Sequence, residues 1–414
     1  MTDEKCSVAR RLASITALGL VLMTQATQAQ TFTVLHNFTG GADGANPFAG
    51  LTWDRAGNLY GTTTYGGYDD HGTVFKLSRK GSSWLFTPLY NFQGGNDGVN
   101  PRAALARGLD GTLYGTTYYG GGYGCSDYGC GTVFNVRPST HASANVFGEW
   151  VETVSYRFLG GLDGANPEAG VIFDRAGGIY GTTRFGGLYG WGAAFGMTPS
   201  DGGWTETVIY SFTGGADGAM PGSSLIFDTT GNLYGTTYGM SLDNPYGTVY
   251  ELSPTETGWA EKTLYTFRGG SDGANPAAGL TFDQSGNLYG TTDYGGSGHG
   301  GTIFQLVQHP NGSWTFTLLY SFSGSPGSNS SLTLDAAGNL YGTSYWSGSH
   351  GFGSVFELIP SNGNWRFTSL HDFTDESDGA YPLGNIVFDA DGSLFSTTSA
   401  GGTYGNGLIF EITP

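Results

Sequence analysis

A single tetrapeptide, repeated along the whole chain, constrains the fold more than any other feature. Tyr-Gly-Thr-Thr or a close variant begins at Tyr60, Tyr114, Tyr180, Tyr234, Tyr289, Tyr341 and Phe395. These starts lie 54, 66, 54, 55, 52 and 54 residues apart, and the longest interval reflects additional residues in the second unit. A near-constant period of this size is typical of an architecture in which each repeat is one supersecondary unit.

Each repeat predicts four strands. In the fifth unit they span residues 279–283, 288–292, 302–306 and 314–322, and Gly-rich turns separate them. Apolar and polar residues alternate along these runs, which favours strands over helices. Glycine is abundant, at 74 of 414 residues, but 25 Tyr and 26 Phe argue against a disordered chain. Seven units of four antiparallel strands predict an all-β, seven-bladed β-propeller.

The two ends of the chain complement each other. Residues 31–38 resemble the fourth strand of a unit, whereas residues 407–414 resemble a third strand and lack a fourth. We therefore expect residues 31–38 to complete the blade formed by residues 383–414. This pairing would close the ring and leave no exposed sheet edge. The predicted propeller spans residues 30–414.

The N-terminus has the pattern of a signal peptide over residues 1–29. Arg10 and Arg11 precede an apolar run, residues 12–23, which is too short to span a bilayer, and cleavage is expected after Ala26 or Ala29. The sequence thus predicts a secreted or periplasmic protein, with no membrane insertion. A net charge of −18 without basic clusters excludes nucleic acid as a partner. We expect a monomer that needs no cofactor.

Two cysteines, Cys125 and Cys130, lie in a Gly-rich loop of the second unit. Because an exported protein meets an oxidising compartment, they predict a disulfide that pins this loop. Two thiolates without a second ligand pair do not make a tetrahedral zinc site.

The repeat resembles the GloVer tandem repeats of bacterial secreted and surface proteins. The resemblance covers residues 32–414. It rests on three motifs, Gly-Asn-Leu-Tyr-Gly-Thr-Thr, a Gly-Gly pair and Gly-Thr-Val-Phe-Lys/Glu-Leu, as in residues 57–77. It implies fold and export but no activity. Members carry varied C-terminal anchoring segments. Since this sequence ends at Pro414, we expect release or periplasmic residence instead.

Two sets of aspartates recur with the repeat. One set, with Asp43 as its first member, lies in Asp-Gly loops between blades, and the other, with Asp54 as its first member, precedes a hairpin glycine on the opposite face. We expect both sets to stabilise turns through hydrogen bonds to backbone N–H groups. Blade symmetry would place the first set too far apart to share one calcium ion.

The loops between the second and third strands share one face with the inter-blade loops and are rich in aromatic and histidine side chains. Flat rings with a polar tip favour binding surfaces, although these rings could instead pack over the blade ends. A metal site shared by the histidines is not expected, because their units are too far apart around the ring. The candidate ligand-binding residues are Tyr65, Tyr68, His71, Tyr119, Tyr123, Tyr189, Trp191, Tyr294, His299, Trp346 and His350.

Three functions fit these patterns. The aromatic loop face favours a non-catalytic binding propeller for a glycan or an extracellular protein. The first alternative is a polysaccharide-active enzyme, a lyase or hydrolase with its site at the channel mouth, although no catalytic motif is present. The second is a structural cell-surface protein. An enzyme would need one blade-specific cluster of residues.

Overall fold

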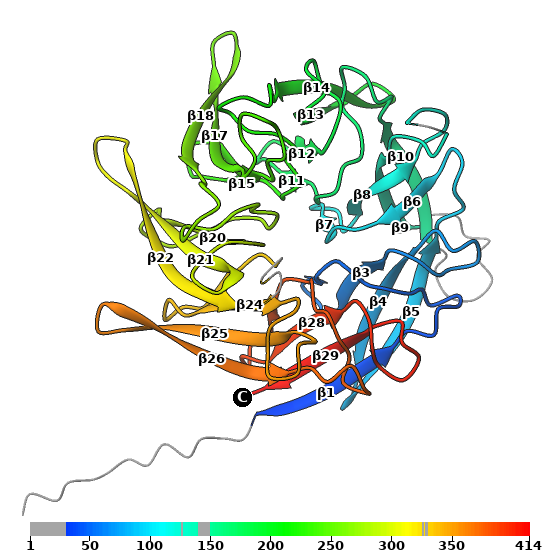
Figure 1. Ribbon diagram of the computed structural model, residues 1–414. Helices are drawn as coiled ribbons and strands as arrows, with labels where there is room; N and C mark the ends of the chain where they lie inside the picture. Colours follow the sequence, from blue (N-terminus) through cyan, green and yellow to red (C-terminus); the bar gives the residue numbers. More distant parts are fainter. Residues whose placement is uncertain (1–29, 126, 140–149, 325–326, 328–329) are drawn as a thin grey trace, which may run out of the picture.

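Seven β-sheets stand around a central axis in the computed structural model of the protein (Figure 1). The structure describes residues 30–125, 127–139, 150–324, 327 and 330–414. The predicted signal peptide, residues 1–29, lies outside this part of the chain. The described residues form strands and no helix, so none of their segments is a helix that could cross a membrane. The predicted seven-bladed propeller is confirmed.

Six blades follow one another along the chain, and the seventh joins its two ends. Blade 1 comprises β2 (Thr52–Trp53), β3 (Leu59–Thr63), β4 (Thr73–Lys80) and β5 (Ser83–Asn91). Blade 2 comprises β6 (Gly98–Pro101), β7 (Ala106–Arg107), β8 (Leu113–Gly120), β9 (Thr132–Pro138) and β10 (Trp150–Arg157). Blade 3 comprises β11 (Ile172–Phe173), β12 (Ile179–Thr183), β13 (Ala193–Ser200) and β14 (Gly203–Ser211). Blade 4 comprises β15 (Ile226–Phe227), β16 (Leu233–Thr237), β17 (Thr248–Thr255) and β18 (Gly258–Thr266). Blade 5 comprises β19 (Thr281–Phe282), β20 (Leu288–Thr292), β21 (His299–Gln308) and β22 (Trp314–Ser323). Blade 6 comprises β23 (Thr333–Leu334), β24 (Leu340–Ser344), β25 (Ser354–Ser361) and β26 (Asn364–Asp372). Blade 7 comprises β27 (Val387–Phe388), β28 (Leu394–Thr398), β29 (Leu408–Thr413) and β1 (Thr31–Asn37).

The ring closes through the N-terminal strand. β1 pairs antiparallel with β29, with Thr31 opposite Thr413 and Val34 opposite Phe410. In Figure 1 the blue strand β1 lies along the red strand β29 as the outer strand of blade 7. The composite blade expected from the two chain ends is therefore observed.

The innermost strands are shorter than the sequence predicts. In blade 5 the first strand spans only Thr281–Phe282, because the residues before it leave the sheet and line the central channel. The Gly279 N–H donates to Ser331 Oγ of the next blade, at 3.0 Å, rather than to a strand partner. The third strand, in contrast, extends at both ends to His299 and Gln308.

The hydrophobic core lies between the blades. Each of the seven buried clusters joins side chains of adjacent blades, as where Phe395 and Ile409 of blade 7 pack with Leu59 and Phe75 of blade 1. The glycine of the Tyr-Gly-Thr-Thr motif makes room for this packing. A Cβ on Gly61 would stand 2.5 Å from Cζ of Phe75, closer than real Cβ atoms approach a ring.

A ring of threonine hydrogen bonds links the blades beside the channel. The first threonine of each Tyr-Gly-Thr-Thr motif donates its hydroxyl to a backbone carbonyl of the next blade. The donors and acceptors are Thr62 and Ala103, Thr116 and Ala169, Thr182 and Ser223, Thr236 and Pro276, Thr291 and Ser330, Thr343 and Gly384, and Thr397 and Ala49. The last of these bonds, at 2.8 Å, joins blade 7 to blade 1.

The outer contacts between blades are of two kinds. At four interfaces a Phe of the outer strand stacks on a Tyr or His of the preceding blade: Phe32 on His371, Phe86 on His36, Phe316 on Tyr265 and Phe367 on Tyr320, with ring centroids 3.8–4.5 Å apart. At the other three interfaces the same strand position holds Glu152, Glu206 and Glu261. Blades 2, 3 and 4 thus replace ring stacking with a carboxyl group.

These glutamates lie in an environment that disfavours their charge. Burial raises the pKa of Glu152 to about 8 and that of Glu206 to about 7, and the carboxylates of Asp97 and Asp163 add to the respective shifts. One oxygen, Oε1, of each of these two glutamates is buried without a hydrogen-bond partner among the described residues. Protonation therefore stabilises these interfaces.

Removal of residues 31–38 should open the ring. The deletion leaves β29 as an exposed edge and removes Phe32 and Phe38 from the core, so we expect aggregation or ready proteolysis. Size-exclusion chromatography and limited proteolysis, with the chain starting at residue 30 as the control, measure this. A deleted protein that stays monomeric and melts at the same temperature contradicts the closure described here.

The glutamate interfaces predict that stability falls with rising pH. An unfolded glutamate has a pKa of about 4.3. Because the folded values are higher, the stabilisation is complete below that pH and is lost as pH rises through about 7 to 8. The melting temperature should thus fall from about pH 5 to about pH 8.5, and less so in the double variant Glu152→Gln, Glu206→Gln. Glu256→Gln, at an exposed turn, is the matched control; an equal pH slope in all three proteins rejects the mechanism.

Candidate functional site

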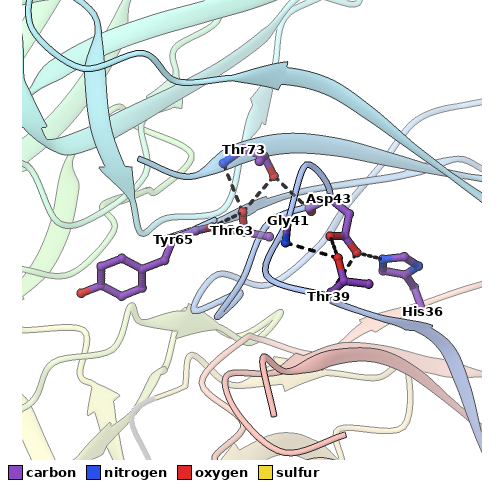
Figure 2. Close-up of polar contacts among 7 residues, drawn as sticks. All are labelled: His36, Thr39, Gly41, Asp43, Thr63, Tyr65 and Thr73. Carbon is purple, nitrogen blue, oxygen red and sulfur yellow. Dashed lines mark hydrogen bonds and ion pairs between the residues drawn. The ribbon is translucent and has the colours of Figure 1, made fainter. Parts of the chain in front are cut away.

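The aspartates of the inter-blade loops are engaged by their own blades. Figure 2 shows the first of them: Asp43 accepts hydrogen bonds from His36 Nε2 and the Thr39 N–H, both at 3.0 Å, and from the Thr39 hydroxyl. Beside this loop, Thr63 Oγ1 donates to the Tyr65 carbonyl and shares a hydrogen bond of 2.8 Å with the Thr73 hydroxyl. Five further loops repeat the contact from strand to aspartate: Tyr90 to Asp97, Tyr156 to Asp163, Tyr210 to Asp217, Tyr265 to Asp272 and His371 to Asp378. The structural role expected of these aspartates is confirmed.

The aspartates of the opposite face also hold turns. Asp54 accepts from the N–H groups of Ala56 and Asn58 and from the hydroxyl of Tyr60. These hydrogen bonds lower the pKa of Asp54 even though its burial acts in the opposite direction. Asp174, Asp228, Asp283, Asp335 and Asp389 hold the equivalent turns.

In most blades a side chain two positions before the third strand, here called the wedge residue, packs against the loop that leads to the next blade. His71 and Trp191 lie against Gly94 and Gly214, where a Cβ would stand 2.6 Å from the facing ring. Both glycines have φ near +75°, a backbone conformation that other residues rarely adopt. The His71 carbonyl also accepts the N–H of Asn100 in the next blade, at 2.9 Å. His71 and Trp191, two of the predicted ligand residues, therefore pack at contacts between blades.

In blade 2 a disulfide takes the place of this wedge. Cys130 occupies the position of His71 and Trp191, and it is bonded to Cys125 with a Cα–Cα distance of 5.2 Å. A Cβ on Gly160 of the next blade would meet both sulfur atoms within 2.7 Å. The predicted disulfide is thus present, and it packs against blade 3 as well as pinning its own loop.

A cavity of about 580 Å³ lies where all seven blades meet, at the mouth of the central channel. Its walls are short backbone segments beside the inner strands, such as Phe48–Gly50 and Arg102–Ala104. Its larger side chains are Phe48, Arg102, Glu168, Arg184, Tyr238, Asp293, Tyr294, Tyr345 and Trp346. Among the described residues no group of three or more His, Cys, Asp or Glu could hold a metal ion, here or elsewhere.

Two positions of the repeat supply most of these side chains, and both vary between blades. One follows the Tyr-Gly-Thr-Thr motif and is occupied in order by Thr64, Tyr118, Arg184, Tyr238, Asp293, Tyr345 and Ser399. The other follows the proline of the inter-blade loop and is occupied by Phe48, Arg102, Glu168, Gly222, Ala277 and Leu383. The residues that precede these two positions, the Tyr-Gly-Thr-Thr motif and the proline, are nearly constant. The ring therefore presents a blade-specific set of groups to one cavity.

The charged side chains of the cavity form a network from blades 2 and 3. Glu168 accepts from Arg184 Nη1 and lies 3.5 Å from Arg102 Nη1. The Arg102 guanidinium lies 4.1 Å from the ring centroid of Tyr118, and that of Arg184 lies 5.2 Å from that of Tyr238. Each arginine is therefore held on one side by a carboxylate and across its face by an aromatic ring.

A buried carboxyl group completes the charged set. Asp293 is 5% exposed, and burial raises its pKa well above the usual range, although the hydrogen bond donated by the Tyr238 hydroxyl and the charge of Arg184 oppose this. The pKa of Tyr238 is raised in turn by its own burial and by Asp293. Glu168, in contrast, is partly exposed and is paired with two arginines.

The predicted ligand residues do not converge on one place. Tyr294 and Trp346, 43% and 39% exposed, line the cavity, and Tyr65 packs edge-on against Phe48 at its wall. Tyr119 packs against Tyr118. The remaining residues lie exposed on the loops around the cavity: Tyr68, Tyr123, Tyr189, His299 and His350.

Seven of the larger side chains of the cavity are absent from the candidate ligand residues chosen from sequence: Phe48, Arg102, Glu168, Arg184, Tyr238, Asp293 and Tyr345. The signal that could have found them is variation inside a constant motif. A position that changes from Tyr to Arg to Tyr to Asp directly after a nearly constant motif is under no structural demand common to all blades. Such positions are free to serve a site that is not symmetric.

The wedge contacts predict a difference between two residues of one loop, Tyr189 and Trp191, that only Gly190 separates. Trp191→Ala removes a ring packed on Gly214 and should lower the stability by about 2 kcal/mol. Tyr189→Ala, at a position 55% exposed, should change the melting temperature little. Thermal denaturation of the two variants tests this, and equal losses would argue against the packing role of Trp191.

Comparisons with known proteins agree on the architecture. Similar solved structures include an ancestral GH74 enzyme (14% identity, 89% of this chain and 47% of that one, TM-score 0.56). They also include PorZ, a bacterial surface component of the type-IX secretion system of Porphyromonas gingivalis (13%, 89% and 46%, 0.52). A gluconolactonase of Xanthomonas campestris matches less well (17%, 59% and 71%, 0.38). This chain thus spans about half the length of the first two proteins, and at these identities the likeness shows the fold alone.

Sequence comparison gives a family match for the repeats themselves. No protein with a curated description matches this chain. The family described as the Gloeobacter/Verrucomicrobia repeat matches residues 18–239, 126–327 and 242–414, which together reach the C-terminus. The resemblance noted in the Tyr-Gly-Thr-Thr motif and its flanks is confirmed: this protein belongs to the Gloeobacter/Verrucomicrobia repeat family.

Proposed function

We propose that this protein is an exported, non-catalytic binding propeller that holds a glycan at the mouth of its central channel. The observation that carries the proposal is the blade-specific lining of one cavity on an otherwise repetitive ring. A repeat that served only as a scaffold would have no need to place a different polar or aromatic group at this position in successive blades.

The size and lining of the cavity suit a short saccharide. A volume of about 580 Å³ lies within the range of ordinary ligand pockets. Trp346 packs against Tyr345 and Tyr381, with ring centroids 5.1 and 4.6 Å away, and is 39% exposed. An indole held in this way offers a pre-ordered apolar surface to a sugar ring, while the arginine, carboxyl and tyrosine groups supply hydrogen bonds to hydroxyls.

Export is supported by two features. Cys125 and Cys130 form a disulfide, which is typical of oxidising compartments. The charged and apolar pattern of residues 1–29 matches a secretory signal. N-terminal sequencing of the protein recovered from a bacterial periplasm or medium tests this part of the proposal. A mature chain that still carries residues 1–29 would contradict it.

Affinity electrophoresis of residues 30–414 against a panel of polysaccharides tests the binding itself. Trp346→Ala and Tyr294→Ala should each weaken retardation by the bound polysaccharide about tenfold, because they remove aromatic surface from the cavity. Tyr68→Ala and Tyr123→Ala, on loop tips that are 81% and 93% exposed, are the matched controls.

Each outcome of this experiment has a distinct meaning. Loss of retardation in the loop-tip variants alone would place the binding site on the loop tips rather than at the channel mouth. Absence of retardation across the panel contradicts the glycan proposal and favours a protein partner or a structural role. Release of reducing ends or unsaturated products from a bound polysaccharide would instead identify an enzyme.

A further inference from the structure

The channel mouth concentrates positive charge in an acidic protein. The chain has 16 Lys and Arg against 34 Asp and Glu, yet two arginines line this one cavity. Arg102 and Arg184 come from adjacent blades, and both contact the same carboxylate, Glu168. Two guanidinium groups against one carboxylate leave a surplus of one positive charge. Burial raises the pKa of the Asp293 carboxyl well above the usual range, which favours its neutral form.

The two arginines are fixed before any ligand arrives. Each has only about a quarter of its side chain exposed, at 24% for Arg102 and 22% for Arg184. Aromatic rings cover one face of each guanidinium, so their N–H groups point outward in the plane of the group. This pair of side chains, Arg102 and Arg184, is called the arginine clamp below. Because its rotamers are already ordered, it loses little conformational entropy when it binds a ligand.

One donor of this clamp lacks a partner. Arg102 Nε is buried and has no hydrogen-bond partner among the residues that the structure describes. Burial of an unpaired donor is costly, and for a charged group the cost is larger. Because the Nε atom is buried, an acceptor in the cavity can pair with it only if the Arg102 side chain shifts toward the ligand.

Glu168 shows which group the clamp accepts. A guanidinium binds a planar carboxylate through two parallel N–H bonds, which a sugar hydroxyl cannot match. Glu168 itself is 27% exposed at the cavity wall, so a ligand can reach the arginines beside it. The Glu168 carboxylate already occupies the arginine clamp, so it competes with a ligand carboxylate for the two guanidinium groups.

We infer that the channel mouth selects a saccharide that carries a carboxylate, a uronic acid, whose carboxylate binds Arg102 and Arg184 in competition with Glu168. This inference rests on the proposed glycan-binding function and names its ligand class. The aromatic side chains of Tyr294 and Trp346 then contact the sugar ring, while the two arginines bind its carboxylate.

Isothermal titration calorimetry with matched oligosaccharides tests the inference. The probes are oligogalacturonate, oligoalginate and oligoglucuronate, each paired with a neutral oligosaccharide of the same length and, where available, the same linkage. The wild-type protein should bind one uronate probe at least tenfold more tightly than its neutral counterpart. Arg102→Gln and Arg184→Gln should each lose about tenfold in affinity for that uronate and clearly less in affinity for its neutral counterpart.

Glu168→Gln gives the sharpest contrast, because it should change affinity in the opposite direction. Removal of the competing carboxylate frees both arginines, so uronate binding should become several-fold tighter. If Glu168 served only to support the cavity, the same variant would weaken binding. Melting temperatures of all three variants show whether they fold, and Arg184→Lys, which keeps the charge without the planar fork, should recover only part of the affinity.

The failures of the two proposals are distinguishable. Neutral sugars that bind as tightly as uronates overturn the inference and leave the glycan proposal standing. The inference is also overturned if dextran sulfate binds as tightly as the best uronate and depends equally on the arginines. The arginine clamp would then recognise negative charge in general rather than a carboxylate. Absence of binding to both uronate and neutral probes overturns the glycan proposal itself.

Discussion

The propeller depends on one hydrogen bond repeated around the channel. In each blade the first threonine of the repeat motif donates to a backbone carbonyl of the next blade, from Thr62 to Ala103 and so on to Thr397 and Ala49. A buried donor left without this acceptor would cost about 1–3 kcal/mol. Because the acceptor carbonyls belong to the segments that line the channel, the same bond sets both the blade spacing and the walls of the cavity.

This constraint explains which positions can vary. The glycine of the motif is fixed by a ring of its own blade, the first threonine by contact with the neighbouring blade, and the inter-blade aspartates by their loops. The residue after the motif lies beyond the last pair of the inner strand and faces the channel mouth. Its side chain contributes to no contact that all blades share. Function can therefore change there without loss of the fold.

The architecture could be predicted from sequence because the repeat is periodic and its ends are complementary. The match between residues 31–38 and a missing fourth strand was enough to predict the composite blade that β1 and β29 form. The site could not be found in the same way. Exposed aromatics such as Tyr68 and Tyr123 stand out in a sequence, whereas convergence of Arg102, Glu168 and Asp293 depends on ring geometry. His71 and Trp191 resembled ligand residues because a packing role against the glycine of another blade leaves no local pattern.

The ring is asymmetric in a consistent way. Blades 2, 3 and 4 carry Glu152, Glu206 and Glu261 where the other blades stack aromatic rings, and the charged network of the cavity comes from blades 2 and 3. Ring stacking contributes beyond its buried area, and a buried carboxyl with a raised pKa does not replace that contribution. The interfaces around Arg102 and Glu168 therefore lack the ring stacking that the interfaces on the far side of the ring have. The sector that holds the charged groups of the cavity is thus also the sector in which the outer contacts between blades depend on the protonation of carboxyl groups.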